Sequence, residues 1–156
     1  MRREHDLLGE LDIPEDAYYG IQTFRSVENF KITGLRLCDF PDFIKGLAYT
    51  KQAAAEANHE LGYLSDEVYK AMIQACKEVA EGKFDKEFVV DMIQGGAGTS
   101  TNMNANEVIA NRANEILGKA KGTYSPCHPN NHVNFAQSTN DAYPTAAKLG
   151  ISLNTP

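Results

Sequence analysis

A glycine-rich segment that runs directly into a helical pattern constrains the fold of this chain more than any other feature. Residues 94–114 read QGGAGTSTNMNANEVIANRAN, with three glycines in four positions and then a run of hydroxyl and amide side chains. Glycine lets a backbone turn tightly and approach a ligand closely, and Ser, Thr and Asn are favoured where a helix begins. From Asn104 onward apolar residues recur at helical spacing until Gly118, a typical helix stop. The segment therefore predicts a glycine loop that leads into a helix N-terminus.

Such a loop can bind an anion, or it can be only a turn. Free N–H groups and the helix dipole attract a carboxylate or phosphate to a helix N-terminus. A nucleotide loop is disfavoured, because no Gly-Lys-Ser/Thr follows and the third glycine of a dinucleotide fingerprint is absent. The loop by itself leaves both the turn and the anion site open.

Length and charge exclude several classes of protein. At 156 residues and 42% hydrophobic, the chain is expected to fold as one globular domain with a core of its own. Its net charge of −6 argues against nucleic acid or an anionic membrane as a partner. No apolar run is long enough to span a bilayer, and the start of the chain lacks the apolar core of a secretory signal. The three cysteines are widely spaced, which favours reduced thiols, a cytoplasmic location and no metal site.

The hydrophobic spacing predicts a mainly α fold. Helices are expected over residues 42–61, 66–81, 102–117 and 141–150, where capping residues precede apolar stripes. The first 30 residues are dense in turn formers, so we expect at most a short β-hairpin there, with extended pieces around residues 12–13 and 18–21. Residues 84–93 are expected to form a short helical or irregular link.

Three further places hold side chains that could bind a ligand. Ser138, Thr139 and Asn140 precede an acid and a helical run, and three such groups exceed what one N-cap requires. The fork of Arg25 could hold a carboxylate bidentately, or it could form a surface pair with Glu28.

The third place is a segment with two histidines four residues apart, His128 and His132. Pro129 lies between them and no third ligand is close, so a zinc site is disfavoured. The alternative is an Asn-rich turn that hydrogen-bonds its own backbone.

These segments together resemble the aspartase/fumarase superfamily of lyases. The resemblance is carried by GGAGTSTNMNANEVIANRA, by a Tyr-Gly, Thr-x-Arg and Glu-Asn-Phe pattern within residues 19–30, by the His-Pro-Asn loop and by Gln-Ser-Thr-Asn-Asp-x-x-Pro-Thr. It covers residues 6–147, about the first third of a superfamily member. It implies that residues 1–156 are a single N-terminal helical domain, truncated before the central helical bundle.

The resemblance also implies a reaction, the reversible elimination of ammonia from L-aspartate to give fumarate, without a cofactor. The positions that match the superfamily's substrate-binding residues are Thr99, Ser138, Thr139 and Asn140, with Arg25 as a weaker addition. His128 and Asn130 match a secondary anion site, although Asn131 stands where fumarases tend to have Asp.

No side chain of this chain matches the proton acceptor, which superfamily members carry on a later serine loop that does not occur here. Because their active sites draw residues from three subunits, the full-length protein is expected to be a cytoplasmic homotetramer. This chain alone is expected to be an inactive monomer.

Two alternatives to an aspartase domain remain. One is a class II fumarate hydratase domain, although Ala97, Thr139 and the Tyr18-Tyr19-Gly20 sequence favour the aspartase branch. The other is a non-catalytic helical module that binds a partner or a small anion.

Overall fold

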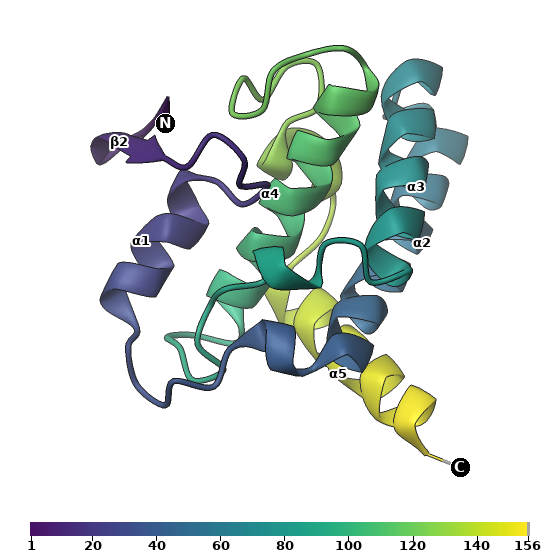
Figure 1. Ribbon diagram of the computed structural model, residues 1–156. Helices are drawn as coiled ribbons and strands as arrows, with labels where there is room; N and C mark the ends of the chain where they lie inside the picture. Colours follow the sequence, from purple (N-terminus) through teal and green to yellow (C-terminus); the bar gives the residue numbers. More distant parts are fainter. Residues whose placement is uncertain (156) are drawn as a thin grey trace.

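The computed structural model describes residues 1–155, and it is mainly helical (Figure 1). A short antiparallel hairpin comes first, followed by helices and single helical turns that are joined by loops. In chain order the elements are β1 (Arg2–Asp6), β2 (Gly9–Ile13), α1 (Ile21–Asn29), the 3₁₀ turn η1 (Leu37–Asp39), α2 (Pro41–Glu60), α3 (Asp66–Ala80), the 3₁₀ turn η2 (Asp85–Glu87), α4 (Thr99–Ile116), the π-helical turn η3 (Pro129–Val133) and α5 (Thr139–Asn154).

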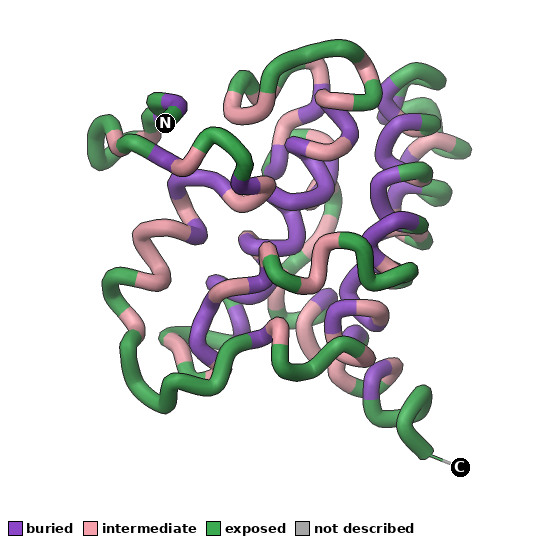
Figure 2. Tube along the Cα trace, viewed as in Figure 1, coloured by how far each residue is buried: buried purple, intermediate pink, exposed green. Residues whose placement is uncertain are grey.

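Helix α4 is the centre of the molecule. The pair α2 and α3 lies on one side of it, and the hairpin and α1 lie on the other (Figure 1). The buried parts of the trace follow α4 and the neighbouring faces of α2 and α3 (Figure 2). The largest apolar cluster joins all three helices, with Leu47, Met72, Cys76, Val108 and Ile109 among its fully buried members. Burial of these side chains is the main term that holds the helices together.

Helix α4 is buried although much of its surface is polar, because its asparagines hydrogen-bond the surrounding loops. The amide of Asn114 pairs with both backbone groups of Cys127, at 2.8 and 2.9 Å. Asn104 accepts from the backbone N–H of Val89 and donates to the carbonyl of Glu87. A side-chain amide carries the same donor and acceptor as a peptide group, so each of these asparagines gives a loop the pairing that it would otherwise lack.

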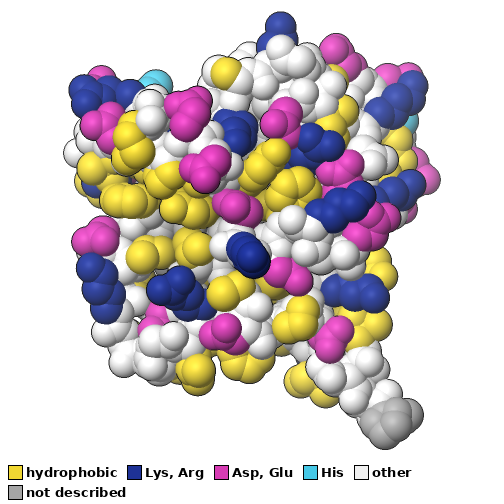
Figure 3. Space-filling view, viewed as in Figure 1, with side chains coloured by type: hydrophobic (Ala, Val, Ile, Leu, Met, Phe, Trp, Pro, Cys, Tyr) yellow, Lys and Arg dark blue, Asp and Glu magenta, His cyan; other side chains and the backbone are white. Residues whose placement is uncertain are grey.

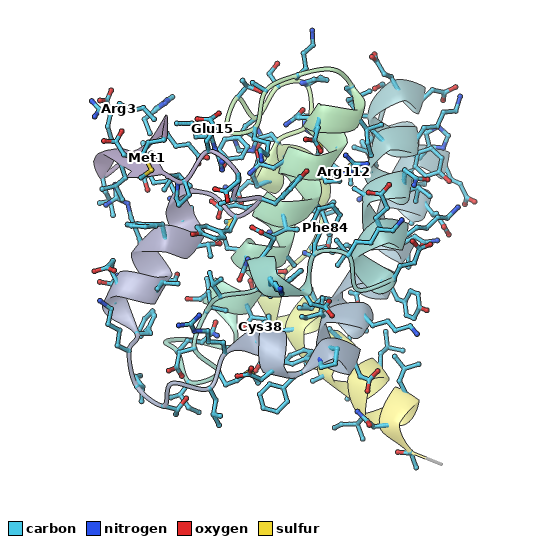
Figure 4. All side chains as sticks on the ribbon, viewed as in Figure 1. Met1, Arg3, Glu15, Cys38, Phe84 and Arg112 are labelled. Carbon is cyan, nitrogen blue, oxygen red and sulfur yellow. The ribbon has the colours of Figure 1, made fainter. Side chains whose placement is uncertain are left out.

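A partly buried salt bridge joins α3 to α4. The guanidinium of Arg112 lies 2.6 Å from a carboxylate oxygen of Glu78 and stacks 6.0 Å from the ring centroid of Phe84. Figure 4 shows Arg112 extending from α4 toward Phe84, in the link after α3.

Helices α2 and α5 pack with their backbones in contact. A Cβ added at Gly46 would overlap the carbonyl oxygen of Ala146, and one at Gly150 would lie 3.1 Å from the carbonyl of Asp42. Glycine at these two positions therefore sets how closely the helices approach, and this packing holds α5 against α2 as far as Gly150. The last turn of α5 is exposed and projects from the molecule (Figures 1 and 2).

The mainly α fold and the four predicted helices are confirmed, with ends that shift by a few residues. The hairpin is also confirmed, although it spans residues 2–13. The extended piece expected around residues 18–21 is wrong, because Ile21 begins helix α1, which the sequence did not predict. The link over residues 84–93 contains only the short turn η2, as expected.

No helix within residues 1–155 is long and apolar enough to cross a membrane. On the face shown in Figure 3, Lys and Arg side chains lie among Asp and Glu side chains, and hydrophobic side chains gather near α1.

Candidate functional site

The first turns of α4 and α5 lie side by side and bring two of the predicted segments together. The Nδ2 group of Asn102, in the first turn of α4, donates to Oγ1 of Thr139 at 3.2 Å. One residue before α4, Gly98 has a φ of +81° and lies directly against the ring of Tyr143 on α5. The glycine loop and the Ser-Thr-Asn segment therefore form one continuous surface.

A hollow of about 310 Å³ lies at this junction. It is bounded by the glycine loop on one side and by the start of α5 on the other. Its lining residues are Met92, Ile93, Gln94, Gly96, Ala97, Gly98, Asn140, Tyr143 and Pro144. The hollow thus lies at a helix N-terminus, where free backbone N–H groups favour a small anion.

Two of the predicted side chains at this junction are not hydrogen-bonded by any other group of residues 1–155. Thr99 is the first residue of α4 and Asn140 is the second residue of α5, and both are exposed. Within residues 1–155 neither side chain makes a hydrogen bond. Their donors are therefore available to a ligand.

The other two predicted residues, Ser138 and Thr139, do have hydrogen-bond partners within the chain. Ser138 is the N-cap of α5, and its Oγ accepts from the backbone N–H of Asn140 at 3.2 Å. The sequence alternative of a plain N-cap is thus correct for Ser138, although its own O–H remains a donor. Oγ1 of Thr139 accepts from Asn102, so its O–H is likewise left to donate.

A fully buried lysine underlies this surface, and it was not among the predicted site residues. Lys51 of α2 is 0% exposed. Its Nζ donates to Oδ1 of Asn102 at 2.7 Å, and to Oδ1 of Asn134 and Oε1 of Gln137 at 2.9 Å. Burial lowers the pKa of Lys51 to about 7, while three oxygen acceptors favour the ammonium form.

One signal in the sequence could have identified Lys51. It lies four residues after Leu47, three after Ala48 and four before Ala55, so it shares the apolar face of α2. A lysine in the middle of an apolar helical stripe must either extend to solvent or find polar partners inside.

Arg25 is held by a carboxylate of its own chain. Its Nε and Nη2 atoms lie 2.8 and 2.9 Å from the two oxygens of Asp6, which is a bidentate pair. The sequence alternative of a pair with Glu28 is wrong, since Glu28 pairs with Lys31. Any substrate carboxylate at Arg25 would have to displace Asp6.

His128 and Asn130 line a second hollow, of about 640 Å³, between the hairpin and η3. His128 caps η3, with its Nδ1 accepting from the backbone N–H groups of Asn130 and Asn131. The alternative of a turn that hydrogen-bonds its own backbone is therefore confirmed. Burial lowers the pKa of His128, which favours the neutral ring that this capping requires.

The same hollow also contains acidic groups. Asp6 and Glu107 contribute to its lining, so an anion bound at His128 would meet negative charge as well as donors. The predicted pair of residues does lie in one pocket, but the pocket is mixed in charge.

Cys76, Cys127 and His132 do not form a reactive centre. Burial raises the pKa of Cys76 and of Cys127 to about 12, so both remain thiols. His132 accepts from the backbone N–H of His128 through Nδ1. No group of three or more His, Cys, Asp or Glu residues within the described part of the chain could hold a metal ion.

Comparisons with known proteins agree on one family. A family model described as "Lyase" matches residues 9–155. The aspartate ammonia-lyase of Pseudomonas fluorescens is 60% identical over 152 residues, which are 97% of this chain and 32% of that protein. The aspartate ammonia-lyase of Escherichia coli K12 is 50% identical over 152 residues, with the same shares covered.

Two solved structures have nearly the same fold. The fumarate lyase:delta crystallin of Brucella melitensis is 54% identical, with a TM-score of 0.95 over 98% of this chain and 34% of that one. The class II fumarase of Schistosoma mansoni is 40% identical, with a TM-score of 0.91 over 99% of this chain and 32% of that one. The chain thus spans about a third of the length of the relatives it matches.

Proposed function

The chain belongs to the lyase family, as its resemblance to the aspartase/fumarase superfamily predicted, and from this premise we propose that it is the N-terminal domain of an aspartate ammonia-lyase. In this proposal residues 1–156 supply substrate-binding groups to an enzyme that reversibly eliminates ammonia from L-aspartate to give fumarate. The catalytic base and the central helical bundle belong to a part of the enzyme outside this chain.

The observation that carries the proposal is the junction of α4 and α5. Thr99 starts one helix, and Ser138, Thr139 and Asn140 start the other, while the Asn102 to Thr139 hydrogen bond holds the two starts together. A dicarboxylate with an amino group needs several neutral donors at short range, and this surface offers them.

The chemistry explains why neutral donors suit this reaction. Removal of a proton from the carbon beside a carboxylate places a second negative charge on that carboxylate before the amine leaves. Preorganised N–H and O–H donors directed at those oxygens lower the barrier, because they stabilise charge that develops only during the reaction. We assign Thr99, Ser138, Thr139 and Asn140 to the carboxylates and the amino group of aspartate.

Other groups play lesser parts in the proposal. Arg25 can contribute to substrate binding only where Asp6 releases it. His128 and Asn130 form a secondary anion site, whose affinity is limited by the carboxylates of the same hollow. The full-length enzyme is a cytoplasmic homotetramer, and its substrates are L-aspartate and fumarate.

Sequence identity favours an ammonia-lyase over a class II fumarate hydratase. The relatives named aspartate ammonia-lyase are 50–60% identical to this chain, whereas the class II fumarase is 40% identical. Both kinds of enzyme share this architecture, so the reaction must be measured directly.

A chimera provides that measurement. This chain would replace the matching N-terminal third of the Pseudomonas fluorescens relative, and the product would be assayed for ammonia release from L-aspartate and for fumarate formation from malate. We expect the first activity. Fumarate formation from malate alone would show a fumarate hydratase domain, and loss of both activities in a folded chimera would contradict the proposal.

Two substitutions in the chimera test the site. Thr99→Val and Asn140→Ala should each lower kcat/KM about 10²–10³-fold, the scale for loss of one oxyanion donor. Thermal unfolding should change little, because both side chains are exposed. Thr145→Val, at an exposed position of α5, is the matched control and should keep parental kinetics. Parental kinetics in the first two variants would show that the site is misassigned.

Calorimetry of this chain with aspartate, fumarate and succinate distinguishes the proposal from a non-catalytic module. A substrate-binding domain should bind these dicarboxylates at least weakly, whereas a pure interaction module should bind none.

A further inference from the structure

Lys51 is a buried lysine with no acidic partner within residues 1–155. Its side chain is 0% exposed, and its ammonium contacts only the amide oxygens of Asn102, Asn134 and Gln137. Burying a charge without a counter-ion is costly, and a well-packed apolar side chain is often no worse for stability than a buried charge. A lysine at this position therefore indicates a role other than packing.

The ammonium determines which way three amide side chains point. An ammonium has three donors and no acceptor, so each amide turns its oxygen toward Nζ and its NH₂ group away. The NH₂ of Gln137 donates to the carbonyl of Val133, and that of Asn134 donates to the carbonyl of Gln137. The NH₂ of Asn102 lies 2.9 Å from Oδ1 of Asn134 and 3.2 Å from Oγ1 of Thr139.

The hydrogen-bond network that begins at Lys51 reaches the surface at Thr139. A hydroxyl has one O–H and two acceptor lone pairs. Because the Asn102 NH₂ donates to Oγ1, that NH₂ cannot accept the hydroxyl proton, and the O–H points to a different acceptor. A carboxylate bound at the start of α5 is such an acceptor.

We propose that Lys51 is a positioning residue of the substrate site, which through Asn102 holds the Thr139 hydroxyl as a donor directed at a substrate carboxylate. The proposal rests on the proposed function, because it requires Thr139 to bind substrate. Its physical basis is preorganisation: a hydroxyl whose proton already points outward needs no reorientation when negative charge develops. Lys51 itself does not touch the substrate in this scheme.

A double-mutant cycle in the chimera tests the connection. Thr139→Val removes the hydroxyl and Lys51→Met removes the charge, and each should lower kcat/KM for L-aspartate about tenfold to hundredfold, the scale of a hydrogen bond to a charged group. Because both act through one hydroxyl, the double variant should lose little more than the worse single variant. Lys45→Met, on the same helix but outside the network, is the matched control and should keep parental kinetics.

The cycle also tells the two proposals apart. A Thr139→Val chimera with parental kinetics would overturn the proposed role of Thr139 and the inference with it. Losses that multiply in the double variant would overturn the role of Lys51 and leave that of Thr139 intact.

A second variant keeps the lysine and reverses the direction of the hydrogen bond between residue 102 and the Thr139 hydroxyl. In Asn102→Asp the carboxylate still accepts from Lys51, and the new ion pair favours folding. Its second oxygen cannot donate to Thr139 or to Oδ1 of Asn134. It instead accepts the hydroxyl proton, and the lost bond to Asn134 offsets part of what the ion pair contributes to stability. We expect a chimera that unfolds at a temperature close to the parental one but loses as much kcat/KM as Thr139→Val. Parental kinetics in this variant would overturn the proposal.

Nuclear Overhauser effects in the unmodified chain decide the matter if a variant does not fold. The Nδ2 protons of Asn102 should show contacts with the side chain of Thr139. These protons also lie near the Lys51 ammonium, because both groups donate to Oδ1 of Asn134. Contacts with the ammonium that are stronger than those with Thr139 would mean that the amide points the other way, which would overturn the proposal.

Discussion

Gly98 satisfies two constraints at a single position. Its φ of +81° lies in the left-handed region, where a Cβ is strained, and a Cβ added there would overlap the ring of Tyr143. The first constraint comes from the turn into α4, and the second comes from the packing of α5 on the loop. The junction of α4 and α5 that contains the proposed site thus requires a residue without a Cβ at position 98.

Replacing Gly98 by alanine should therefore destabilise the chain more than the same change at a left-handed glycine that has no close neighbour. Gly118 is the matched comparison, with a φ of +70° and no other group within 4 Å of the place where a Cβ would lie. We expect Gly118→Ala to cost about 1–2 kcal/mol of unfolding free energy from the left-handed conformation. Gly98→Ala should cost about 1–3 kcal/mol more, because the ring must move. Equal losses in urea unfolding would show that the Tyr143 contact does not matter.

The sequence indicated polar residues that are exposed at the α4–α5 junction, but it did not indicate Lys51 beneath them. Thr99 and Asn140 stand in recognisable segments, and the structure leaves both exposed. Asn102 and Asn104 stand in the same run of polar residues as Thr99, but their amides bind Lys51 and the loop at Val89. Local sequence shows which groups are polar, whereas their partners come from distant segments.

At the level of elements, α1 is a helix whose N-terminus is capped by distant carboxylates. Its N-cap, Gly20, has no side chain to cap it. The backbone N–H groups of Gly20, Gln22 and Thr23 donate instead to Glu107 of α4, at 2.8–3.0 Å, and that of Ile21 donates to Glu4 of β1. Carboxylates stabilise a helix N-terminus, so α1 depends on tertiary contacts for a cap. A search for local capping residues could not have predicted it.

Glu107→Gln should weaken α1 selectively. A glutamine side chain has one acceptor oxygen in place of two, so at least one of the three backbone donors is left facing an NH₂ group. A buried unsatisfied donor costs about 1–3 kcal/mol, and we expect a loss of that size in unfolding free energy. Hydrogen exchange should show faster exchange at Gln22 and Thr23 than in α2. The exposed Glu60→Gln variant should show neither effect, and unchanged protection of α1 in Glu107→Gln would refute the capping role.

Asp91 joins two loops in a similar way, and it should make the free energy of unfolding fall at acid pH. It accepts hydrogen bonds from the backbone of Thr33, Gly34 and Ile93 and from the hydroxyl of Thr33. Burial acts to raise the pKa of Asp91, but the hydrogen bonds from Ile93, Thr33 and Gly34 outweigh it and hold the pKa below its usual range.

The sign of the effect follows from that shift. A folded-state pKa below the unfolded value of about 3.9 means that the unfolded chain binds the proton first. The contribution of Asp91 is therefore complete above about pH 4 and is lost as the pH falls further. Urea unfolding of the parent and of Asp91→Asn should give free energies that differ at pH 6 and converge toward pH 3. A difference that stays constant over this range would contradict the assignment.

At the scale of the whole molecule, each of the predicted helices α2 to α5 has a local sequence signal for at least one of its ends. Ser65 caps α3 with its own hydroxyl, and Gly62 and Gly82 follow α2 and α3 in left-handed conformation, as the sequence indicated. The arrangement of these helices around α4 could not be predicted from the sequence. It depends on buried amides and on glycines such as Gly46, which lies against the backbone of another helix.

The last prediction is that this chain alone does not release ammonia from L-aspartate. Elimination needs a base within hydrogen-bonding reach of the abstracted proton, and the candidates are engaged elsewhere. The acceptor nitrogens of His128 and His132 bind backbone N–H groups, and Glu107 caps α1. Moreover, the exposed donors of Thr99 and Asn140 face water, where an anion gains little from them.

Purified chain should accordingly show no ammonia release above background and only weak binding of aspartate, while the chimera is active under the same conditions. Supplying the remaining two thirds of the Pseudomonas fluorescens relative as a separate fragment should restore activity where the two pieces assemble, because assembly brings a base to the donors and removes water from them. If a clean preparation of this chain deaminated aspartate at an enzyme-like rate, the base would have to lie within it. The assignment of His128, His132 and Glu107 to structural roles would then be wrong.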